Sequence, residues 1–329
     1  MNGAQVHIVV VNWNAGAMLR DCIASIAAHS ARWVARVVVV DNGSTDGSAN
    51  LDEPRLPLKV IRLPTNLGFA AASNRGATDA TAPYILLLNP DTRLEDDVVA
   101  RALDFMQSPE ACDIGVCGIQ LRDQRGEVQR HCARFPDWKT FVGQATGLNR
   151  ILPRVFHPML MEDFDHLSSR RVDHVIGAFY LIRREVWERL GGLDERFFVY
   201  LEDLDLSLRA AALGWGAYYL ADASAFHEGG GTSRQIMGRR LFYALRSRIL
   251  YAAKHFSRAG AIAAASAALL IEPLSRLAMS IAHRSGEEAK ATVSAYRLLY
   301  GDLASICRTA YRLSSINPRA VLSEGRTGN

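Results

Sequence analysis

The sequence predicts an α/β protein with a mostly parallel central sheet and a helical extension at its C-terminal end. Four short apolar runs within the first 90 residues alternate with segments of helical periodicity, which is typical of βαβ units. The runs are continuously apolar, as expected for strands that are buried on both faces. After about residue 233 the strand signal stops, and apolar residues recur at helical spacing instead.

The strands expected in the first half each end at polar residues. They comprise residues 6–11, 37–40, 58–63 and 84–88. A helix is expected after the first strand, because apolar residues recur at helical spacing from Leu19 to Ile26. A second helix, made of small residues, is expected around Asn74. Pro90 cannot continue a central ladder, so the fourth strand is expected to stop just before Asp91.

The second half is less regular at first. Residues 112–173 contain one expected strand, at 114–119, and a loop-rich insert that is expected to cover an acceptor cleft. The regular pattern then returns along the chain. It comprises a strand at 179–182, a helix at 184–190, a turn at 191–194, an aromatic strand that leads into a helix near Glu202, and short strands at 218–220 and 225–227.

Composition indicates a folded protein with an uneven charge. The chain has 329 residues, enough for one large domain or two ordinary ones, and it is 49% hydrophobic and 22% charged. Residues 229–329 carry 15 Lys and Arg against 5 Asp and Glu, whereas the preceding residues carry an acidic excess. A basic C-terminal part on a mildly acidic body suggests that this part faces an anionic partner.

Several classes of protein lose their support. The five cysteines contain no C-x-x-C pair, which argues against a zinc ribbon and a disulfide framework. No basic segment precedes the first strand, so no signal peptide is expected, and cytoplasmic residence is the default expectation. Neither a G-x-G-x-x-G turn nor a P-loop is present. Residues 41–47 resemble a calcium loop only in part, because Gly43 stands where a ligand belongs.

Two aspartates follow apolar strands. Asp41 and Asp91 are expected at the carboxyl edge of the sheet, where ligands bind in open α/β folds. Asp41 can accept hydrogen bonds from a nucleobase or ribose, and Asp91 can hold a hard cation that in turn holds a diphosphate. The structural alternatives are a turn at Asp41 with Ser44 or Thr45 capping a following helix, and a turn at Asp91 that caps a helix starting near Leu94.

A second set of polar residues occurs later in the chain. Glu202 and Asp203 begin a helix and lie outside its expected buried face, which a helical wheel assigns to residues 204, 208, 211 and 212. Acids at a helix N-terminus interact favourably with its dipole, but they also suit a general base. His227 is followed by glycines that leave room for a phosphate or a metal, although a lone histidine is more often a packed one.

These segments together resemble the family 2 glycosyltransferases of the GT-A fold, a Rossmann-like fold, and most closely their bacterial rhamnosyltransferase-like branch. The matching segments occur in order and at family spacing over about residues 6–233. They are residues 10–14, 40–48, 66–69, 89–91, 191–195, 200–206 and 227–233.

The resemblance implies a metal-dependent, inverting hexosyltransferase and assigns roles to residues. Asp203 would be the catalytic base, with Glu202 as the alternative. Asp91 would hold Mg²⁺ or Mn²⁺ from the last position of a D-x-D motif whose first position is Asn89, and His227 would complete the metal shell. The residues that the resemblance implies for binding the donor are Asn12, Asn14, Asp41, Asn42, Gly68, Asn74, Asn89 and Asp91.

The function implied is transfer of L-rhamnose from dTDP-rhamnose to a lipid-linked or growing cell-surface polysaccharide acceptor. Alternatives are another donor, such as a UDP-hexose or galactofuranose nucleotide, and a catalytically silent scaffold that binds a nucleotide sugar. A nucleotidyltransferase would need a glycine-rich, basic loop after the first strand, and residues 12–16 do not supply one. A nucleic-acid partner is disfavoured, because no recognition motif accompanies the basic residues.

The expected domains are a catalytic domain at 1–233, a basic amphipathic helical extension at 234–315 and a flexible tail at 316–329. The catalytic domain would divide into a nucleotide-sugar half, about 1–110, and an acceptor half, about 111–233. Residues 239–258 place apolar and basic side chains on different faces, with Arg248 as the exception. They indicate either a packed helix with a solvated face or a helix on anionic lipid.

The uncharged residues that follow this helix are too few to form a membrane-spanning helix. Residues 259–271 are uncharged, but these 13 residues are fewer than the ~20 that span a bilayer. A peripheral position on the inner face of the cell membrane is therefore expected.

Overall fold

The computed structural model describes residues 4–229 and 237–314, which form two compact units. Within these residues, unit 1 comprises 4–133, 160–198 and 202–229, and unit 2 comprises 134–159, 199–201 and 237–314. The expected tail at 316–329 and the end of the last motif, residues 230–233, lie outside the described residues.

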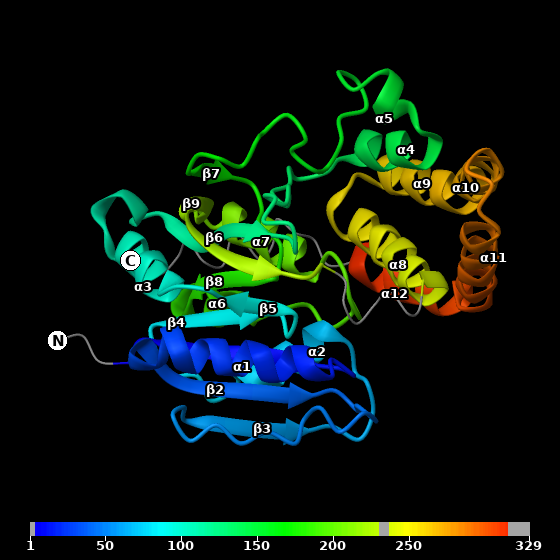
Figure 1. Ribbon diagram of the computed structural model, residues 1–329. Coiled ribbons are helices and arrows are strands. Elements are labelled where there is room, and N and C mark those ends of the chain that lie inside the picture. Colours follow the sequence, from blue (N-terminus) through cyan, green and yellow to red (C-terminus); the bar gives the residue numbers. More distant parts are fainter. Residues whose placement is uncertain (1–3, 230–236, 315–329) are drawn as a thin grey trace. The chain divides into compact units, whose positions relative to one another are not determined.

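Unit 1 is built on one sheet of nine strands. Their order is β3–β2–β1–β4–β8–β6–β9–β5, with β7 paired to β9 (Figure 1). β1 to β4 are parallel to one another, as are β6 and β9, whereas β5, β7 and β8 run antiparallel to their neighbours. The predicted mostly parallel sheet is confirmed. The strands are β1 (Val6–Asn12), β2 (Val34–Asp41), β3 (Leu58–Arg62), β4 (Tyr84–Leu88), β5 (Thr92–Leu94), β6 (Ile114–Arg122), β7 (Arg170–Val172), β8 (Phe179–Arg183) and β9 (Gly216–His227).

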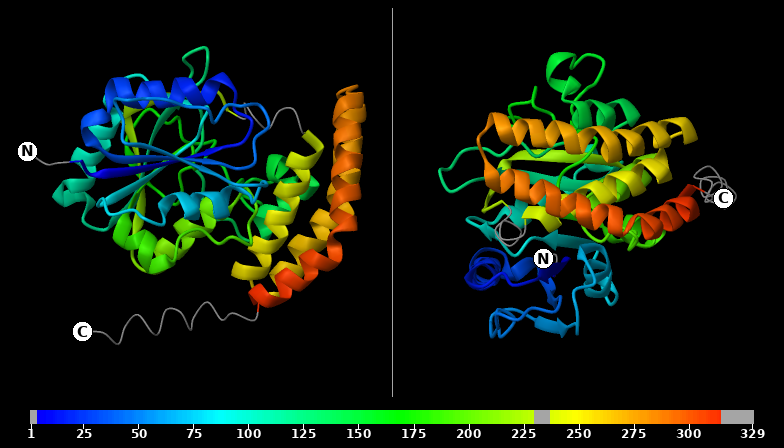
Figure 2. Two further views of the ribbon diagram at one scale, coloured as in Figure 1. Left: turned by 90° about the horizontal axis from the view of Figure 1, so that it is seen from below. Right: turned by 90° about the vertical axis from the view of Figure 1, so that its right-hand side faces the viewer.

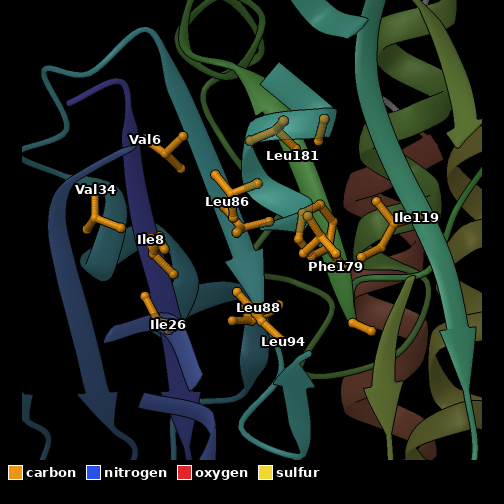
Figure 3. Close-up of a cluster of buried hydrophobic side chains, with 14 of the residues drawn as sticks. Val6, Ile8, Ile26, Val34, Leu86, Leu88, Leu94, Ile119, Phe179 and Leu181 are labelled. Carbon is orange, nitrogen blue, oxygen red and sulfur yellow. The ribbon is translucent and has the colours of Figure 1, made fainter. Parts of the chain in front are cut away.

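Helices cover both faces of this sheet, and its central strands β1 and β4 are buried along their whole length. Ile8 and Val10 of β1 belong to a core cluster that also contains residues of α1 (Ala17–His29) and α3 (Val98–Gln107) (Figure 3). Val9 and Val11 of the same strand belong to the opposite cluster. That cluster includes residues of α2 (Phe69–Ala77), α6 (Arg184–Leu190) and α7 (Glu202–Ala212). Alternate side chains of a strand point to opposite faces, so both sets become core.

Two expected helix starts are wrong. The described chain between β2 and β3 contains no helix, so Ser44 and Thr45 cap none. Their polar groups instead hydrogen-bond to the loop after β1. Leu94 belongs to β5 rather than to a helix, because residues 92–94 pair with the end of β9. The next helix, α3, begins at Val98, where the Asp97 carboxylate accepts from the Ala100 N–H group (3.3 Å).

The expected aromatic strand before Glu202 is also wrong. Residues 198–201 form bends, and Tyr200 and Leu201 both have positive φ angles, 70° and 66°. Consecutive non-glycine residues in this region are strained, and such strain is concentrated at functional sites. The two short strands expected at 218–220 and 225–227 are parts of one strand, β9.

Unit 2 is helical, and α8 (Met237–His255) lies at its centre (Figure 2). The apolar side of α8 is buried against α9, α11 and α12, which belong to the same unit. Arg248, the exception on the helical wheel, is buried and pairs with Glu272 at 2.6 Å. The other helices of unit 2 are α4 (Trp138–Thr146), α5 (Leu148–Ile151), α9 (Arg258–Ser266), a π-helical segment (Ala267–Ile271), α10 (Glu272–Ala282), α11 (Gly286–Gly301) and α12 (Leu303–Ser314).

The uncharged stretch at 259–271 is longer as a helix than its sequence suggests. The helix does not end at Glu272 and Pro273, and it runs from Arg258 to Ala282. Among the described residues, this 25-residue run is the one helix that is long and apolar enough, by length and composition, to cross a membrane.

A buried histidine pair beside β6 predicts acid instability. His131 is buried, its Nε2 atom bonds to the Ile119 carbonyl (3.0 Å), and its Nδ1 atom has no hydrogen-bond partner among the described residues. His166 Nε2 accepts from the backbone N–H groups of His131 and Cys132. Burial, with the nearby His166, lowers the pKa of His131 to about 3.

Stability is therefore expected to fall as the pH drops below about 6.5. The unfolded chain binds a proton at this histidine between pH 6.5 and about 3, whereas the folded chain does not. At pH 5 the loss from this one group is roughly 2 kcal/mol. Urea midpoints at pH 7.5 and pH 5 measure it. The difference between them should shrink in His131→Gln and not in the exposed control His29→Gln. An equal pH dependence in His131→Gln would contradict this prediction.

Candidate active site

Asparagine amides tie together the loops that follow β1 and β2. Asn12, the last residue of β1, directs its Nδ2 group at Asp41 Oδ1 (3.0 Å), Ser44 Oγ (3.1 Å) and Ser48 Oγ (2.8 Å). Asn14 accepts from the Thr45 N–H group at Oδ1 (2.8 Å), and its own N–H donates to Ser44 Oγ (3.0 Å). Both loops lie at the carboxyl ends of adjacent parallel strands, so the polar side chains gather at one edge.

The loop after β3 joins the same cluster through Asn42. The Asn42 Nδ2 group donates to Asn66 Oδ1 (3.0 Å) and to the Gly68 carbonyl (3.1 Å), and its Oδ1 accepts from the Leu67 N–H group (2.8 Å). Gly68 has a φ angle of +88°, and a Cβ atom there would lie 2.3 Å from the Phe198 carbonyl oxygen. Only glycine fits this close approach, so Gly68 shapes the loop.

Asn74 has a different position from the other predicted donor-binding residues. It lies on α2, where its Nδ2 group donates to the Leu193 carbonyl (2.8 Å) and to Glu195 Oε1 (3.0 Å). Its Oδ1 atom accepts from the Leu193 N–H group (2.9 Å). The amide of Asn74 therefore holds the turn after α6, whereas Asn12, Asn14, Asp41, Asn42 and Gly68 come together.

Strand register places Asp91 beside His227. After β4, the backbone turns so that the Thr92 N–H group donates to the Asn89 carbonyl (3.1 Å). Thr92 then pairs with His227 across β5 and β9, and the Glu228 N–H group donates to the Asp91 carbonyl (3.1 Å). As a result, Asp91 Oδ1 lies 3.5 Å from His227 Nε2, and both side chains are more than 90% buried. Asn89 is placed by its N–H group, which donates to the Ala178 carbonyl (3.0 Å).

Gln129 determines which nitrogen of His227 carries the proton. The Gln129 Nε2 group donates to the His227 carbonyl (2.7 Å), which directs Gln129 Oε1 at His227 Nδ1 (2.9 Å). An amide oxygen only accepts, so Nδ1 carries a hydrogen, and in the neutral ring Nε2 then presents a lone pair. Histidine ligands of metals are commonly oriented in this way. Gln129 lies in the irregular part of the chain, and no pattern in the sequence indicates it.

The Asp91–His227 pair fits a divalent cation. His227 Nε2 is buried and has no hydrogen-bond partner among residues 4–229 and 237–314. A lone pair that faces a carboxylate oxygen is unfavourable unless a positive charge lies between them. No group of three or more His, Cys, Asp or Glu residues that could hold a metal is found in the described part of the chain, so this part supplies one carboxylate and one imidazole.

A cavity of about 680 Å³ opens beside Asp91, within unit 1. Its volume lies in the range of small-molecule sites. Charged residues of both signs line it. They are the arginines Arg93, Arg122 and Arg125 and the acids Asp21, Asp91, Glu95, Asp123 and Glu228.

The two acids at the start of α7 have different environments. Asp203 is partly exposed, and its two oxygens accept from the backbone N–H groups of Gly177 (2.8 Å) and Leu204 (2.8 Å). Glu202 is 4% exposed, so the helical wheel was wrong to place it outside the buried face. Burial, together with the adjacent Asp203, raises the pKa of Glu202 well above its usual range. Burial therefore favours the neutral form of Glu202.

A hydrogen-bond chain leads from the core to Asp203. His174 Nε2 lies 3.7 Å from Asp203 Oδ2, and His174 Nδ1 bonds to Ser207 Oγ (2.9 Å). Ser207 Oγ also bonds to the buried Tyr180 hydroxyl (2.9 Å). Burial lowers the pKa of His174, which keeps its ring neutral. When the Tyr180 hydroxyl donates to Ser207 and the Ser207 hydroxyl donates to His174 Nδ1, the hydrogen of the neutral ring lies on Nε2. This N–H group then faces the Asp203 carboxylate, which is an electrostatically favourable arrangement.

The fold and the comparisons with known proteins agree on the class of protein. The chain is a glycosyltransferase of the GT-A fold. A solved structure with the same fold is a mannosyltransferase from Pyrobaculum calidifontis, in complex with GDP-mannose and Mn²⁺. It is 17% identical, with a TM-score of 0.54 over 98% of this chain and 86% of that chain.

The family model described as glycosyl transferase family 2 matches residues 7–191, and the chain belongs to this family, in its rhamnosyltransferase-like branch. One relative is the N-acetylglucosaminyl-diphospho-decaprenol L-rhamnosyltransferase of Mycobacterium tuberculosis. It is 32% identical over 235 residues, which are 67% of this chain and 75% of the relative. The rhamnosyltransferase WbbL of Escherichia coli is 27% identical over 174 residues, 52% of this chain and 62% of the relative.

Proposed function

We propose that this glycosyltransferase moves L-rhamnose from dTDP-rhamnose to a lipid-linked or growing cell-surface polysaccharide acceptor, with inversion at the anomeric carbon. The observation that carries the proposal is the buried Asp91–His227 pair, whose lone pair and carboxylate suit a cation at the edge of the sheet where a nucleotide would bind. The choice of donor and acceptor is supported by the names of the relatives, two of which are rhamnosyltransferases.

In this proposal, the loops at the carboxyl edge bind the nucleotide. The Asp41 carboxylate accepts hydrogen bonds from the base or ribose, and Asn12 and Asn42 hold the surrounding loops in place. Among the residues that line the cavity beside Asp91, the three arginines are those that would pair with the diphosphate. Asn89 acts through its backbone, which positions Asp91 in the turn.

Asp203 is the proposed base. It takes the proton of the acceptor hydroxyl while the hydroxyl oxygen bonds to the anomeric carbon and the bond to the diphosphate breaks. Its two oxygens accept hydrogen bonds from backbone N–H groups, and His174 Nε2 lies 3.7 Å from Oδ2, so the carboxylate is held in one position. Glu202 is less suited to the role, because its side chain is buried and burial favours the neutral form of its carboxyl group.

Asp91 and His227 are the residues that would hold Mg²⁺ or Mn²⁺. When bound, the ion would supply neutralisation of the charge that develops on the departing diphosphate. Since the pair contains a single carboxylate, metal affinity is expected to depend strongly on the phosphates of the donor.

We also propose a cellular location for the protein and a division of the chain into functional regions. An acceptor attached to a lipid requires work at a membrane, so we place the chain on the inner face of the cell membrane. Residues 1–110 would bind the donor and residues 111–233 the acceptor, with 234–315 as the basic extension.

A panel of donors tests the proposed function. Release of the nucleoside diphosphate is measured with Mg²⁺ or Mn²⁺, with dTDP-rhamnose, a UDP-hexose and a galactofuranose nucleotide, and with a polyprenyl-diphosphate sugar as acceptor. Turnover is expected to be fastest with dTDP-rhamnose. Faster turnover with a different donor would overturn the assignment of the sugar. Metal-dependent binding without release from any donor would instead indicate a silent nucleotide-sugar scaffold.

A further inference from the structure

The helical run Arg258–Ala282 in unit 2 buries its acidic residue and has apolar residues outside. Its one acidic residue, Glu272, is 1% exposed and pairs with Arg248 of α8 (2.6 Å) and with Arg276 (2.7 Å). On the opposite side, every residue from 259 to 282 that is classed as exposed is Ala, Ile, Leu, Met or Ser. A surface helix of a water-soluble domain normally has the reverse arrangement.

The π-helical segment aligns the largest exposed side chains. Ile262, Leu270, Leu274 and Ile281 are between 60% and 77% exposed. In an uninterrupted α-helix, Leu270, Leu274 and Ile281 would be rotated about the helix axis by roughly a quarter to a third of a turn from Ile262. A π-helical turn holds about one residue more than an α-helical turn, so residues after the segment at 267–271 are rotated back. The four side chains consequently form one stripe, here called the apolar stripe.

The run lies along unit 2 rather than across a bilayer. α9 packs against α4 and α8, and α10 packs against α4 and α11. A spanning orientation would carry these helices, and the buried Arg248–Glu272 pair, into the hydrocarbon. An in-plane orientation leaves the packed side in place and exposes only the apolar stripe.

The charge of unit 2 favours anionic lipid as the partner. Its described residues include 16 Lys and Arg against 5 Asp and Glu. Exposed basic residues lie at both ends of the run, at Arg258 and Arg284. A second copy of the chain would cover the stripe with another basic surface, whereas an anionic bilayer attracts each basic residue near its surface.

We propose that Arg258–Ala282 lies in the plane of an anionic membrane, with the apolar stripe at the boundary between headgroups and acyl chains. This inference names the surface that the proposed work on a lipid-linked acceptor would use. It rests on that function only for its biological context, because the stripe and the basic charge are properties of unit 2 alone.

Vesicle co-sedimentation of the full chain tests the inference. Wild-type protein is expected to sediment with vesicles of phosphatidylcholine and phosphatidylglycerol, and less with phosphatidylcholine alone or at high salt. The double variant Leu274→Glu, Ile281→Glu should bind at least roughly tenfold more weakly. Val293→Glu, at a 59% exposed position on α11, is the matched control and should bind as wild type does.

Three outcomes would overturn the inference. They are absence of wild-type binding to anionic vesicles, unchanged binding of the double variant, and a lipid-free dimer that the double variant converts to a monomer. Mn²⁺-dependent binding of dTDP is measured on the same preparations and should be equal in all variants. That binding tests the proposed donor site, so failure of the membrane inference and failure of the proposed function give different results.

Discussion

Asp203→Asn is expected to lower kcat for sugar transfer by about 10²–10⁴-fold. The asparagine side chain has nearly the same shape, but it cannot take a proton from the acceptor hydroxyl. Donor affinity should change little, because the nucleotide-binding loops do not include Asp203. Transfer is measured as nucleotide release with acceptor present, and donor binding is measured by calorimetry. Full activity in this variant would remove Asp203 from the mechanism.

Glu202→Gln is the matched control for the Asp203 variant. Burial raises the pKa of Glu202 and favours its neutral form, which glutamine reproduces, so transfer should remain within a few-fold of wild type. A loss as large as that of Asp203→Asn would indicate that Glu202 is the base. Ser207→Ala breaks the chain behind His174 without touching Asp203, and it should lower kcat by about tenfold with KM unchanged.

Asp91→Asn is expected to lower kcat/KM by at least about a hundredfold and to weaken Mn²⁺ binding. It removes the one carboxylate of the Asp91–His227 pair, and metal neutralisation of a leaving group contributes several kcal/mol. Binding of Mn²⁺ is followed by electron paramagnetic resonance, with and without dTDP. In the wild type, dTDP should strengthen Mn²⁺ binding strongly, since the protein offers few charged ligands.

Variants around Asp91 distinguish the proposed metal ligands from the residue that orients His227. His227→Asn should weaken Mn²⁺ binding in the presence of dTDP, and Gln129→Ala should do so by about 10–100-fold, because the ring is then no longer held in one tautomer. Asp96→Asn, on the exposed loop after β5, is the matched control and should bind Mn²⁺ normally. Normal Mn²⁺ binding in both Asp91→Asn and His227→Asn would rule out this metal site.

The first half of the fold follows closely from local sequence patterns. Continuous apolar runs predict β1 to β4 and their parallel arrangement, because strands of this kind must be buried on both faces. The same patterns place Asp41 and Asp91 at strand ends. The prediction failed where a long-range partner overrides local preference. β5 forms because β9 is available to pair with residues 92–94, not because those three residues favour a strand.

The candidate site likewise contains residues that local sequence patterns indicate and residues that only long-range contacts place. The residue types expected to bind a nucleotide and a metal can be read from the chain, since Asn12, Asp41 and Asp91 follow recognisable strands. Asn74 is an exception, because its amide is used by a turn more than 100 residues away in the chain. Gln129 and His174 have no sequence pattern at all. Each is placed by contacts with distant segments, at His227 and at Asp203.

By itself, the sequence determined the α/β class, the mostly parallel sheet, the family of the chain and the polar residues at the ends of its strands. These depend on periodicity and on short motifs, which are local properties. Only the tertiary structure decided that Glu202 is buried while Asp203 is partly exposed, and that His227 directs Nε2 at Asp91. It also decided that the helix after Arg258 turns its apolar side outward. Protonation, tautomer and exposure depend on burial and on partners that the chain brings together only when it folds.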